Sequence, residues 1–406
     1  MPEAPASPAK IEWTLPADLL LEIVARSDTR TLFRCAATSK LLRRDILDPP
    51  FIHRATRGGI LPGCILACLN THDNEADPPP PLSLVPPTTT AAAVSFLDDI
   101  LFPYTSRFAN DLLGEYIPVM SRGGLVLLRR RRNVSDKLSN LCVYNLITGH
   151  RTFLSNPPDI VSNSTRRYVL LTAADGIGCS FMVFSANRHI MLDNNIHIIQ
   201  VQTATSVCPT WAKSAMVHKT GELFEDLWYA MHRGAAVLYG GVIHWLVRRR
   251  GEIVTYNVCT MEQGTIMLPA HVTNFKGGRS HLGSYYSHDG RKLLRLMVFK
   301  EFKIYVWHQL PDGEWAPANV LIDMEKKLQL LDPHANHDWL PHTNFKWSGE
   351  GSNMVLLLYG SITIHPALLI LIDLETKEIL MEYSSISSVL LEVDLPSRLR
   401  SINFFA

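Results

Sequence analysis

The sequence has no excess of charge of either sign and no long uninterrupted apolar run. It contains 39 Lys and Arg against 38 Asp and Glu, which leaves a net charge of +1. A chain so close to neutral has no overall electrostatic attraction for nucleic acid or for an anionic membrane. The longest apolar stretch, residues 354–374, is interrupted by Gly360, His365 and Pro366, and it fits two strands better than a membrane span. We therefore expect neither a nucleic-acid partner nor a membrane partner.

Cysteines are few, and they follow no pattern. There are seven, an odd number, and they are scattered along the chain. Cys64 and Cys68 have no second pair to complete a zinc site. Residues 1–10 lack the charged start and the apolar core of a signal peptide. We therefore predict reduced, mostly buried thiols and a location in the cytosol, the nucleus or both.

The motifs that mark common enzymes are also missing. The sequence has no G-x-S-x-G nucleophile elbow, no G-x-x-x-x-G-K-[ST] phosphate loop and no H-E-x-x-H metal pair. The strongest metal candidates are His334, His337 and His342, but histidines in a proline-bounded loop are more often turn residues. We expect no catalytic residue, no metal and no cofactor, and therefore a protein that is not an enzyme.

What the sequence does contain begins with a short helical segment. Pro16 suits a first helical turn, because the N–H that proline lacks has no helical partner there. Apolar residues then recur at helical spacing from Leu15 to Val24, and two more short segments follow before Pro49-Pro50. Three helices in about forty residues have too little interior to bury all their apolar surface. Part of this apolar stripe, the helically spaced residues from Leu15 to Val24, is therefore expected to face a partner. The alternative is a helical cap packed on the rest of the chain.

Residues 13–54 resemble an F-box. The resemblance rests on Leu15-Pro16, the run from Asp18 to Leu20, Arg34-Cys35 and Ser39-Lys40. It implies binding to a Skp-family adaptor and, through that adaptor, to a cullin-based ubiquitin ligase.

The F-box pattern also assigns the adaptor contacts. Three positions depart from it, since Ser27, Thr38 and Leu42 stand where Leu, Val and Trp are usual, and these changes remove apolar contact area. By the resemblance, the adaptor contacts are Leu15, Pro16, Leu19, Leu20, Ile23, Leu32, Cys35 and Ser39.

A two-strand unit recurs along the chain from Gly59 onward. There, short apolar runs alternate with Gly, Pro, Asn and Asp, which is typical of strands. In the two clearest copies, residues 123–148 and 240–260, a Gly-Gly pair opens an apolar strand, arginines follow, and a second strand ends in Asn and a nearby Thr. Five copies place Tyr144, Ile199, Tyr256, Tyr305 and Ile372 at equivalent positions, with spacings of 55, 57, 49 and 67 residues.

Purely β repeats of roughly fifty residues are typical of four-stranded propeller blades. One blade cannot bury both of its faces, so several must pack around an axis. We therefore predict a mainly β protein with a small α module, namely a three-helix F-box followed by a β-propeller-like domain of five to six blades. Apolar segments at 60–69 and 395–405 are expected to pair and to close the ring. A β-sandwich is the alternative.

These features divide the chain into a disordered tail (1–12), an F-box (13–57) and a β domain (58–406). A proline-rich segment at 73–93 is expected to form a solvated loop. The combination resembles F-box proteins of the plant type, which carry a propeller-like F-box-associated domain after the F-box.

Arginine-bearing turns form the candidate target-binding surface. Arginine runs occupy the same turn of two copies, Arg188 lies near the matching turn of a third, and Lys300 and Lys303 lie at that of a fourth. Equivalent turns of a propeller emerge at one end, where Arg can pair with carboxylate or phosphate. The alternative is that these charges only keep the turns soluble. The candidate residues are Arg129, Arg130, Arg131, Arg132, Arg248, Arg249, Arg250 and Lys300.

The function predicted from the sequence is that of a substrate-receptor subunit of an SCF-type cullin ubiquitin ligase. The F-box docks the adaptor, and the β domain recruits an unknown protein target for ubiquitination. Such a subunit raises the effective concentration of its target and does no chemistry itself. Two alternatives remain: a propeller-fold ligand-binding protein or hydrolase with a helical cap, and an F-box protein that acts outside a ligase. The apolar stripe from Leu15 to Val24 distinguishes an F-box from a helical cap, because a cap would bury this stripe against the rest of the chain.

Overall fold

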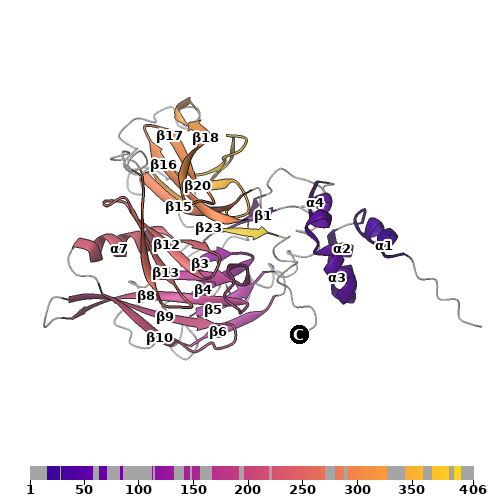
Figure 1. Ribbon diagram of the computed structural model, residues 1–406, viewed down its shortest axis with the longest axis horizontal. Coiled ribbons are helices and arrows are strands. Elements are labelled where there is room, and N and C mark those ends of the chain that lie inside the picture. The colour runs from indigo at the N-terminus through magenta and orange to yellow at the C-terminus, as the bar shows by residue number, and fades with distance from the viewer. Residues whose placement is uncertain are drawn as a thin grey trace, which may run out of the picture.

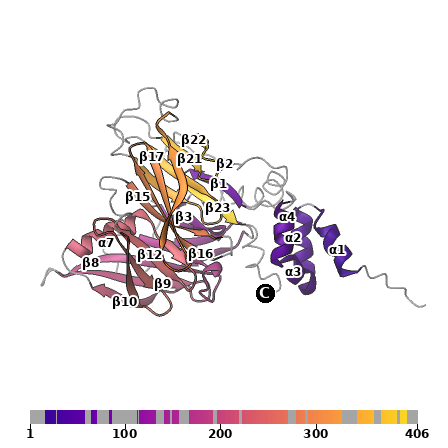
Figure 2. The same cartoon turned by 45° about the horizontal axis from the view of Figure 1, so that its top comes forward.

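The computed structural model describes residues 16–27, 29–57, 64–70, 83–85, 112, 115–131, 141–146, 149–155, 167–191, 196–218, 222–269, 279–287, 291–326, 343–359, 368–383 and 388–394. Four helices lie to one side of a β domain in both views (Figures 1 and 2). They are α1 (Ala17–Val24), α2 (Thr29–Thr38), α3 (Lys40–Ile46) and α4 (Pro49–Arg57). Among the described residues, no helix is long and apolar enough to cross a membrane.

Helix α4 is additional to the three helices that the sequence predicted. The pair Pro49-Pro50 begins this helix and does not only end the previous one. Proline is tolerated in the first turn, where its N–H would have no partner. The four helices share a small core, in which Val24, Leu32, Ile46 and Phe51 are almost fully buried.

The β domain contains five four-stranded antiparallel sheets, in each of which the strands follow sequence order. The blades are blade 1 (β3 Tyr116–Arg122, β4 Leu125–Arg130, β5 Leu141–Asn145, β6 Arg151–Leu154), blade 2 (β7 Arg167–Thr172, β8 Phe181–Met191, β9 Ile196–Thr205, β10 Ala212–His218), blade 3 (β11 Ala236–Leu238, β12 Val242–Val247, β13 Glu252–Asn257, β14 Gln263–Met267), blade 4 (β15 Arg279–Tyr286, β16 Lys292–Lys300, β17 Lys303–Gln309, β18 Trp315–Asp323) and blade 5 (β19 Asn344–Ser348, β20 Met354–Tyr359, β21 Leu368–Asp373, β22 Ile379–Tyr383).

The blades are arranged as in a propeller. First strands of successive blades contact one another, as β3 does with β7, β11 with β15, and β15 with β19. The five positions that defined the sequence repeat all lie in third strands, namely β5, β9, β13, β17 and β21. The propeller-like arrangement predicted from the sequence is therefore confirmed, and the β-sandwich alternative is not.

A sixth, three-stranded sheet joins the two ends of the β domain. Strand β1 (Cys64–Asn70) pairs along its whole length with β23 (Ser388–Asp394), and on its other side with β2 (Ser83–Val85). The prediction that segment 60–69 pairs with a C-terminal strand is confirmed, but the partner assigned to it was wrong. Pairing uses 388–394, and Pro396 lacks the N–H that would continue a ladder. Segment 395–405 lies outside the described residues.

Strand β2 falls within the segment predicted to be a proline-rich loop. Ser83, Leu84 and Val85 stand between two runs of proline, and they pair with Cys68, Ala67 and Leu66 of β1. A strand of this length at the edge of a sheet is compatible with flanking prolines, because its outer N–H groups need no partner strand.

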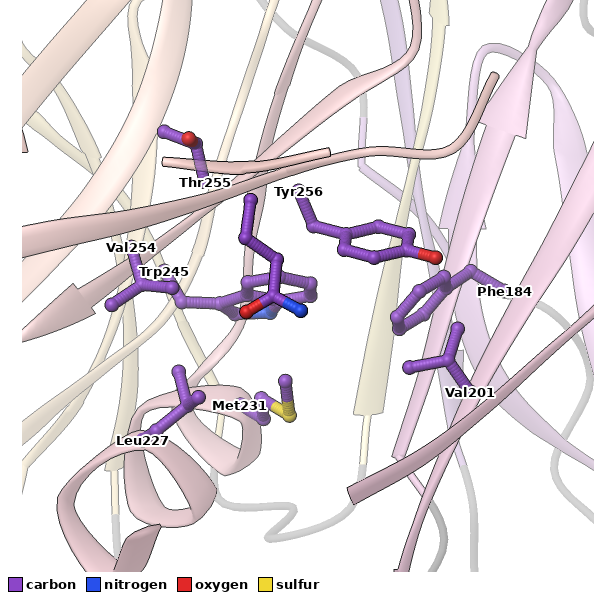
Figure 3. Close-up of a pocket in the computed structure, with 9 residues that line it drawn as sticks. Phe184, Val201, Leu227, Met231, Trp245, Val254, Thr255 and Tyr256 are labelled. Carbon is purple, nitrogen blue, oxygen red and sulfur yellow. The ribbon is translucent and has the colours of Figure 1, made fainter. Parts of the chain in front are cut away.

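Helix α7 (Glu222–Arg233) was not predicted, although its sequence carried the signal. Phe224, Leu227, Trp228 and Met231 recur at helical spacing, and all are buried between blades 2 and 3. Figure 3 shows the small gap beneath α7, where Met231 faces Trp245. At about 10 Å³ the gap has room for one water molecule at most, so it is a packing defect and not a ligand site.

The blade turns emerge at two opposite ends. Turns between first and second strands, and between third and fourth strands, form what we call the network end. Turns between second and third strands form what we call the basic end, because they carry the arginines of the sequence repeat.

Four charged side chains from four blades meet at the network end. Arg122, in the last position of β3, donates to Asp175 (Nη2–Oδ1, 2.7 Å) and to Glu350 (Nε–Oε1, 2.8 Å). Lys292, in the first position of β16, contacts the same two carboxylates at 3.3 and 2.8 Å. Arg122, Lys292 and Asp175 are buried and Glu350 is partly buried. Two positive and two negative charges thus lie together, which compensates for the loss of hydration that makes buried charges unfavourable.

A second pair of charges continues this network toward the closing sheet. Glu392 of β23 accepts hydrogen bonds from the backbone N–H groups of residues 350, 351 and 352, at 2.8, 3.1 and 2.8 Å. Arg295 of β16 donates to the Gly349 carbonyl at 2.8 Å and to Ser348 Oγ at 3.1 Å. The turn that carries Glu350 is therefore fixed from two sides.

The network shifts the pKa values of its members. Burial alone would raise the pKa of Glu350, but the charges of Arg122 and Lys292 outweigh it and lower that pKa to about 2. Burial would likewise lower the pKa of Arg122, whereas Glu350 and Asp175 raise it above its ordinary value. Because the folded-state pKa of Glu350 is depressed, its contribution to stability is present above about pH 4.5 and declines as the pH falls toward 2.

Replacing Glu350 with Gln is expected to lower the free energy of unfolding at pH 7 by about 3–5 kcal/mol, because Arg122 and Lys292 lose a buried counter-charge. The difference from wild type should shrink at pH 3, where the unfolded-state carboxyl is protonated. Urea denaturation at both pH values measures this. The matched control is Glu301→Gln, which removes an exposed partner of Lys300 and should change stability by less than about 1 kcal/mol. An equal loss at pH 7 and pH 3 would contradict the assignment.

Candidate interaction surfaces

Helix α1 presents an exposed apolar face. Leu19 and Ile23 are each 54% exposed and Leu20 is 36% exposed, while Val24, one turn after Leu20, is buried. Pro16 caps the helix, since its carbonyl accepts the Leu20 N–H at 3.1 Å. The structure thus brings together three of the residues that the sequence assigned to adaptor contact, on one helix face and in contact with solvent.

The other predicted adaptor contacts have different surroundings. Pro16 is exposed, Cys35 is half-buried, and Leu15 lies outside the described residues. Leu32 has no exposed surface and belongs to the helical core. Ser39 is the N-cap of α3, because its Oγ accepts the Leu42 N–H at 3.3 Å.

Two of the three departures from the F-box pattern bond to nearby helix carbonyls. Ser27 Oγ donates to the Val24 carbonyl at 2.8 Å, just after α1. Thr38 Oγ1 donates to the Cys35 carbonyl at 3.0 Å, in the last turn of α2. The Val24 carbonyl also accepts the Ser27 N–H at 3.2 Å, so the Ser27 hydroxyl adds a second hydrogen bond to a carbonyl at the helix end. The polar residues at these positions therefore stabilise the helix ends while they reduce the apolar surface.

The structure brings the arginine-bearing turns to one end of the β domain. Residues 248–250 form the turn between β12 and β13, Lys300 ends β16, and Arg129 and Arg130 end β4. Arg132 lies outside the described residues. Residues 248–250 and Lys300 therefore stand at the second-to-third-strand turns of blades 3 and 4, whereas the prediction that Arg129 and Arg130 lie in a turn was wrong, because both pair within β4.

Helix α7 and local partners offset part of this positive charge. Arg188 of β8 pairs with Glu225 of α7 at 2.6 Å, and Arg249 lies 3.5 Å from Asp226 of the same helix. Arg130 is buried, so its guanidinium has little contact with solvent. The candidate residues therefore differ in how far their charges can be reached by a ligand.

Five cysteines of the described ranges are free, and the prediction that most of the seven are buried was wrong. Cys142 is buried, Cys179 is half-buried, and Cys208 and Cys259 are exposed. The three thiols in this set other than Cys142 lie in turns at the network end, where short loops leave little cover. Within the described ranges, no group of three His, Cys, Asp or Glu side chains is placed to hold a metal ion. The histidine-rich segment around 334–342 falls outside those ranges.

Comparison with known families identifies both parts of the chain. An F-box domain model matches residues 14–53, which span α1 to most of α4. A model described as a domain of unknown function, DUF7595, matches residues 88–405. The chain belongs to the DUF7595 family. The family match extends over the five blades of the β domain, and the F-box precedes it.

Solved structures resemble this F-box and DUF7595 chain only distantly. The alignment with a chain of a nidogen/laminin complex covers 82% of this chain and 98% of that chain, with 10% identity and a TM-score of 0.33. The alignment with AofleA from Arthrobotrys oligospora covers 69% of this chain and 75% of that chain, with 10% identity and a TM-score of 0.34. An oligogalacturonate lyase in complex with manganese covers 66% and 63%, with 9% identity and a TM-score of 0.32. No curated protein matches the sequence.

Replacing Ser39 with Ala is expected to destabilise the helical domain by about 1 kcal/mol, because the Leu42 N–H loses its cap. Ser39→Asp restores a side chain that caps well and should recover the loss. Hydrogen exchange of the α3 amides measures the effect. Thr38→Ala, one residue away, is the control and should leave α3 protection unchanged. Equal protection in Ser39→Ala and wild type would show that the cap does not stabilise α3.

Proposed function

We propose that this protein is the substrate-receptor subunit of an SCF-type cullin ubiquitin ligase. Its F-box docks a Skp-family adaptor, and the DUF7595 domain holds a protein target. In this role the protein contributes binding and no chemistry, and it works in the cytosol or the nucleus. The effective concentration of target near the ubiquitin-conjugating machinery supplies the rate enhancement.

The exposed face of α1 carries this proposal. Three large aliphatic residues, Leu19, Leu20 and Ile23, stay in solvent although a large β domain lies nearby. A structural cap would bury them against that domain. A helix face that loses water only on binding a partner is a common recognition mode, with anchors at spacings of three and four residues. The F-box match at the same residues indicates which partner fits.

Adaptor binding is the first test. Full-length protein should retain a purified Skp-family adaptor in a pull-down, and the double variant Leu19→Asp, Leu20→Asp should not. Each substitution places an unpaired carboxylate in an apolar interface, which costs several kcal/mol. Both residues are exposed in the free chain, so the variant is expected to fold.

A matched control separates specific docking through α1 from nonspecific binding through exposed apolar residues. Met267→Asp alters an apolar residue that is 65% exposed, but it lies in blade 3. This variant should bind the adaptor as wild type does. Failure of wild type to bind the adaptor, with folded helices by circular dichroism, would overturn the proposed role.

For the target, we propose the basic end as the surface that attracts acidic or phosphorylated segments. Arg250 is exposed at the tip of the β12–β13 turn, beside Arg249. Arginine pairs with carboxylate and phosphate through two parallel hydrogen bonds. Removal of these charges should therefore weaken binding to anionic peptides.

The charge reversals Arg249→Glu and Arg250→Glu test this surface together. A fluorescent peptide with a run of Glu, and its phosphoserine counterpart, serve as probes in anisotropy titrations. Wild type should bind more weakly as salt rises, and the double variant should lose most of the affinity. Lys377→Glu at the network end is the control and should bind as wild type does. Equal affinities in all three proteins would mean that the arginines only keep the turn soluble.

A further inference from the structure

Three large apolar side chains are exposed in turns at the network end of blades 2 and 3. Val207 is 83% exposed, Tyr239 is 74% exposed and Met261 is 51% exposed. They belong to the β9–β10, β11–β12 and β13–β14 turns. Turn positions usually carry small polar residues or glycine. Three large apolar residues in neighbouring turns therefore need a reason other than turn formation.

Tyr239 is seated on a glycine that has no room for a side chain. Gly176 has a φ of +71°, and a Cβ at that position would lie 2.8 Å from Tyr239 Cε2. The ring therefore lies against the backbone of the neighbouring blade. The Asp175 carbonyl accepts the N–H groups of Gly240 and Gly241 at 2.7 and 3.0 Å, so the turn that carries Tyr239 is tied to the buried network. An aromatic ring held in this way loses little conformational entropy on binding.

The turns around Tyr239 pack into one surface. At Gly241, an added Cβ would meet Ile177 Cγ2 at 3.1 Å and Cys259 Sγ at 3.5 Å. The Ser180 N–H donates to Ser206 Oγ at 3.1 Å, which joins the first turn of blade 2 to its second. We call the four turns 173–180, 206–211, 239–241 and 258–262 the apolar platform.

The exposed charge of the apolar platform is negative, because Asp175 is buried with Arg122 and Lys292 and only Glu262 faces solvent. Its four turns contain no Lys, Arg or His, and their only charged residues are Asp175 and Glu262. Asp175 is buried, whereas Glu262 is exposed beside Met261 and accepts the Thr260 hydroxyl at 2.9 Å. In blade 4 the β15–β16 turn ends in exposed Arg291 and the β17–β18 turn carries exposed Asp312 and Glu314, so carboxylates outnumber cations among the described exposed residues of these two turns. An apolar centre with an acidic edge favours an apolar ligand with positive flanks.

We propose that the apolar platform binds a protein segment that presents an aliphatic or aromatic side chain flanked by Lys or Arg. The apolar side chain packs beside Tyr239 and Met261, and the flanking cation pairs with Glu262. This surface lies at the end opposite the arginine-bearing turns, so it selects ligands of the opposite charge. The inference does not depend on adaptor binding by the F-box.

Selection from a library of displayed random peptides on the full-length chain tests the proposal. Enriched peptides should contain an apolar residue next to Lys or Arg. In anisotropy titrations with a labelled selected peptide, Tyr239→Ser and Met261→Ser should each weaken binding about tenfold or more, as anchor residues do. Glu262→Lys should also weaken binding and make it less sensitive to salt.

Two matched variants guard against trivial explanations. Met267→Ser changes another exposed methionine of blade 3, at the far end of β14, and should leave the affinity unchanged. Tyr239→Phe keeps the ring and should bind as wild type does. The proposal is overturned if Tyr239→Ser and Met261→Ser bind the selected peptides as tightly as wild type. It is also overturned if the enriched peptides are acidic and lose binding in Arg250→Glu, or if no peptide is enriched over a Val207→Ser, Tyr239→Ser, Met261→Ser variant.

Discussion

The β domain depends on one buried carboxylate, that of Asp175. Its side chain binds Arg122 of blade 1 and Lys292 of blade 4, while its backbone carbonyl binds the Gly240-Gly241 turn of blade 3. The residue itself belongs to blade 2, where a capping box with Thr172 fixes it. An isolated buried carboxylate is strongly unfavourable. The charges are therefore compensated only when four blades stand in the correct order, which disfavours other blade arrangements.

This anchoring determines what the two ends of the ring can present. At the network end, the Asp175 carbonyl ties the Gly240-Gly241 turn to the buried charges, so Tyr239 beside it is held in position. Turns at the basic end have no comparable buried network among the described residues. Arg188 and Arg249 are offset instead by carboxylates of α7, and Lys300 is offset by Glu301. The two ends thus differ in both charge and rigidity, and they suit different ligands.

The repeated features of the blades could be predicted from the sequence, whereas the charged network, whose residues do not repeat, could not. Tyr144, Tyr256 and Ile372 share a buried position in third strands, and their spacing made the repeat visible in the sequence. The network residues Arg122, Asp175, Lys292 and Glu350 each occur once, far apart in sequence, and only closure of the ring brings them together. Helix α7 was predictable from its spacing. The exposed face of α1 followed from the small size of the helical unit.

The size of the folded unit that carries them also distinguishes the two sets of exposed apolar residues. Four short helices have little interior, so Leu19, Leu20 and Ile23 would remain partly exposed in any arrangement of that unit. A ring of five blades has ample interior, and the second strands of its blades, such as β12, β16 and β20, are mostly buried. Exposure of Val207, Tyr239 and Met261 is therefore not imposed by a shortage of core. Since the turns would close with small polar residues as well, these side chains are better explained by a ligand than by folding.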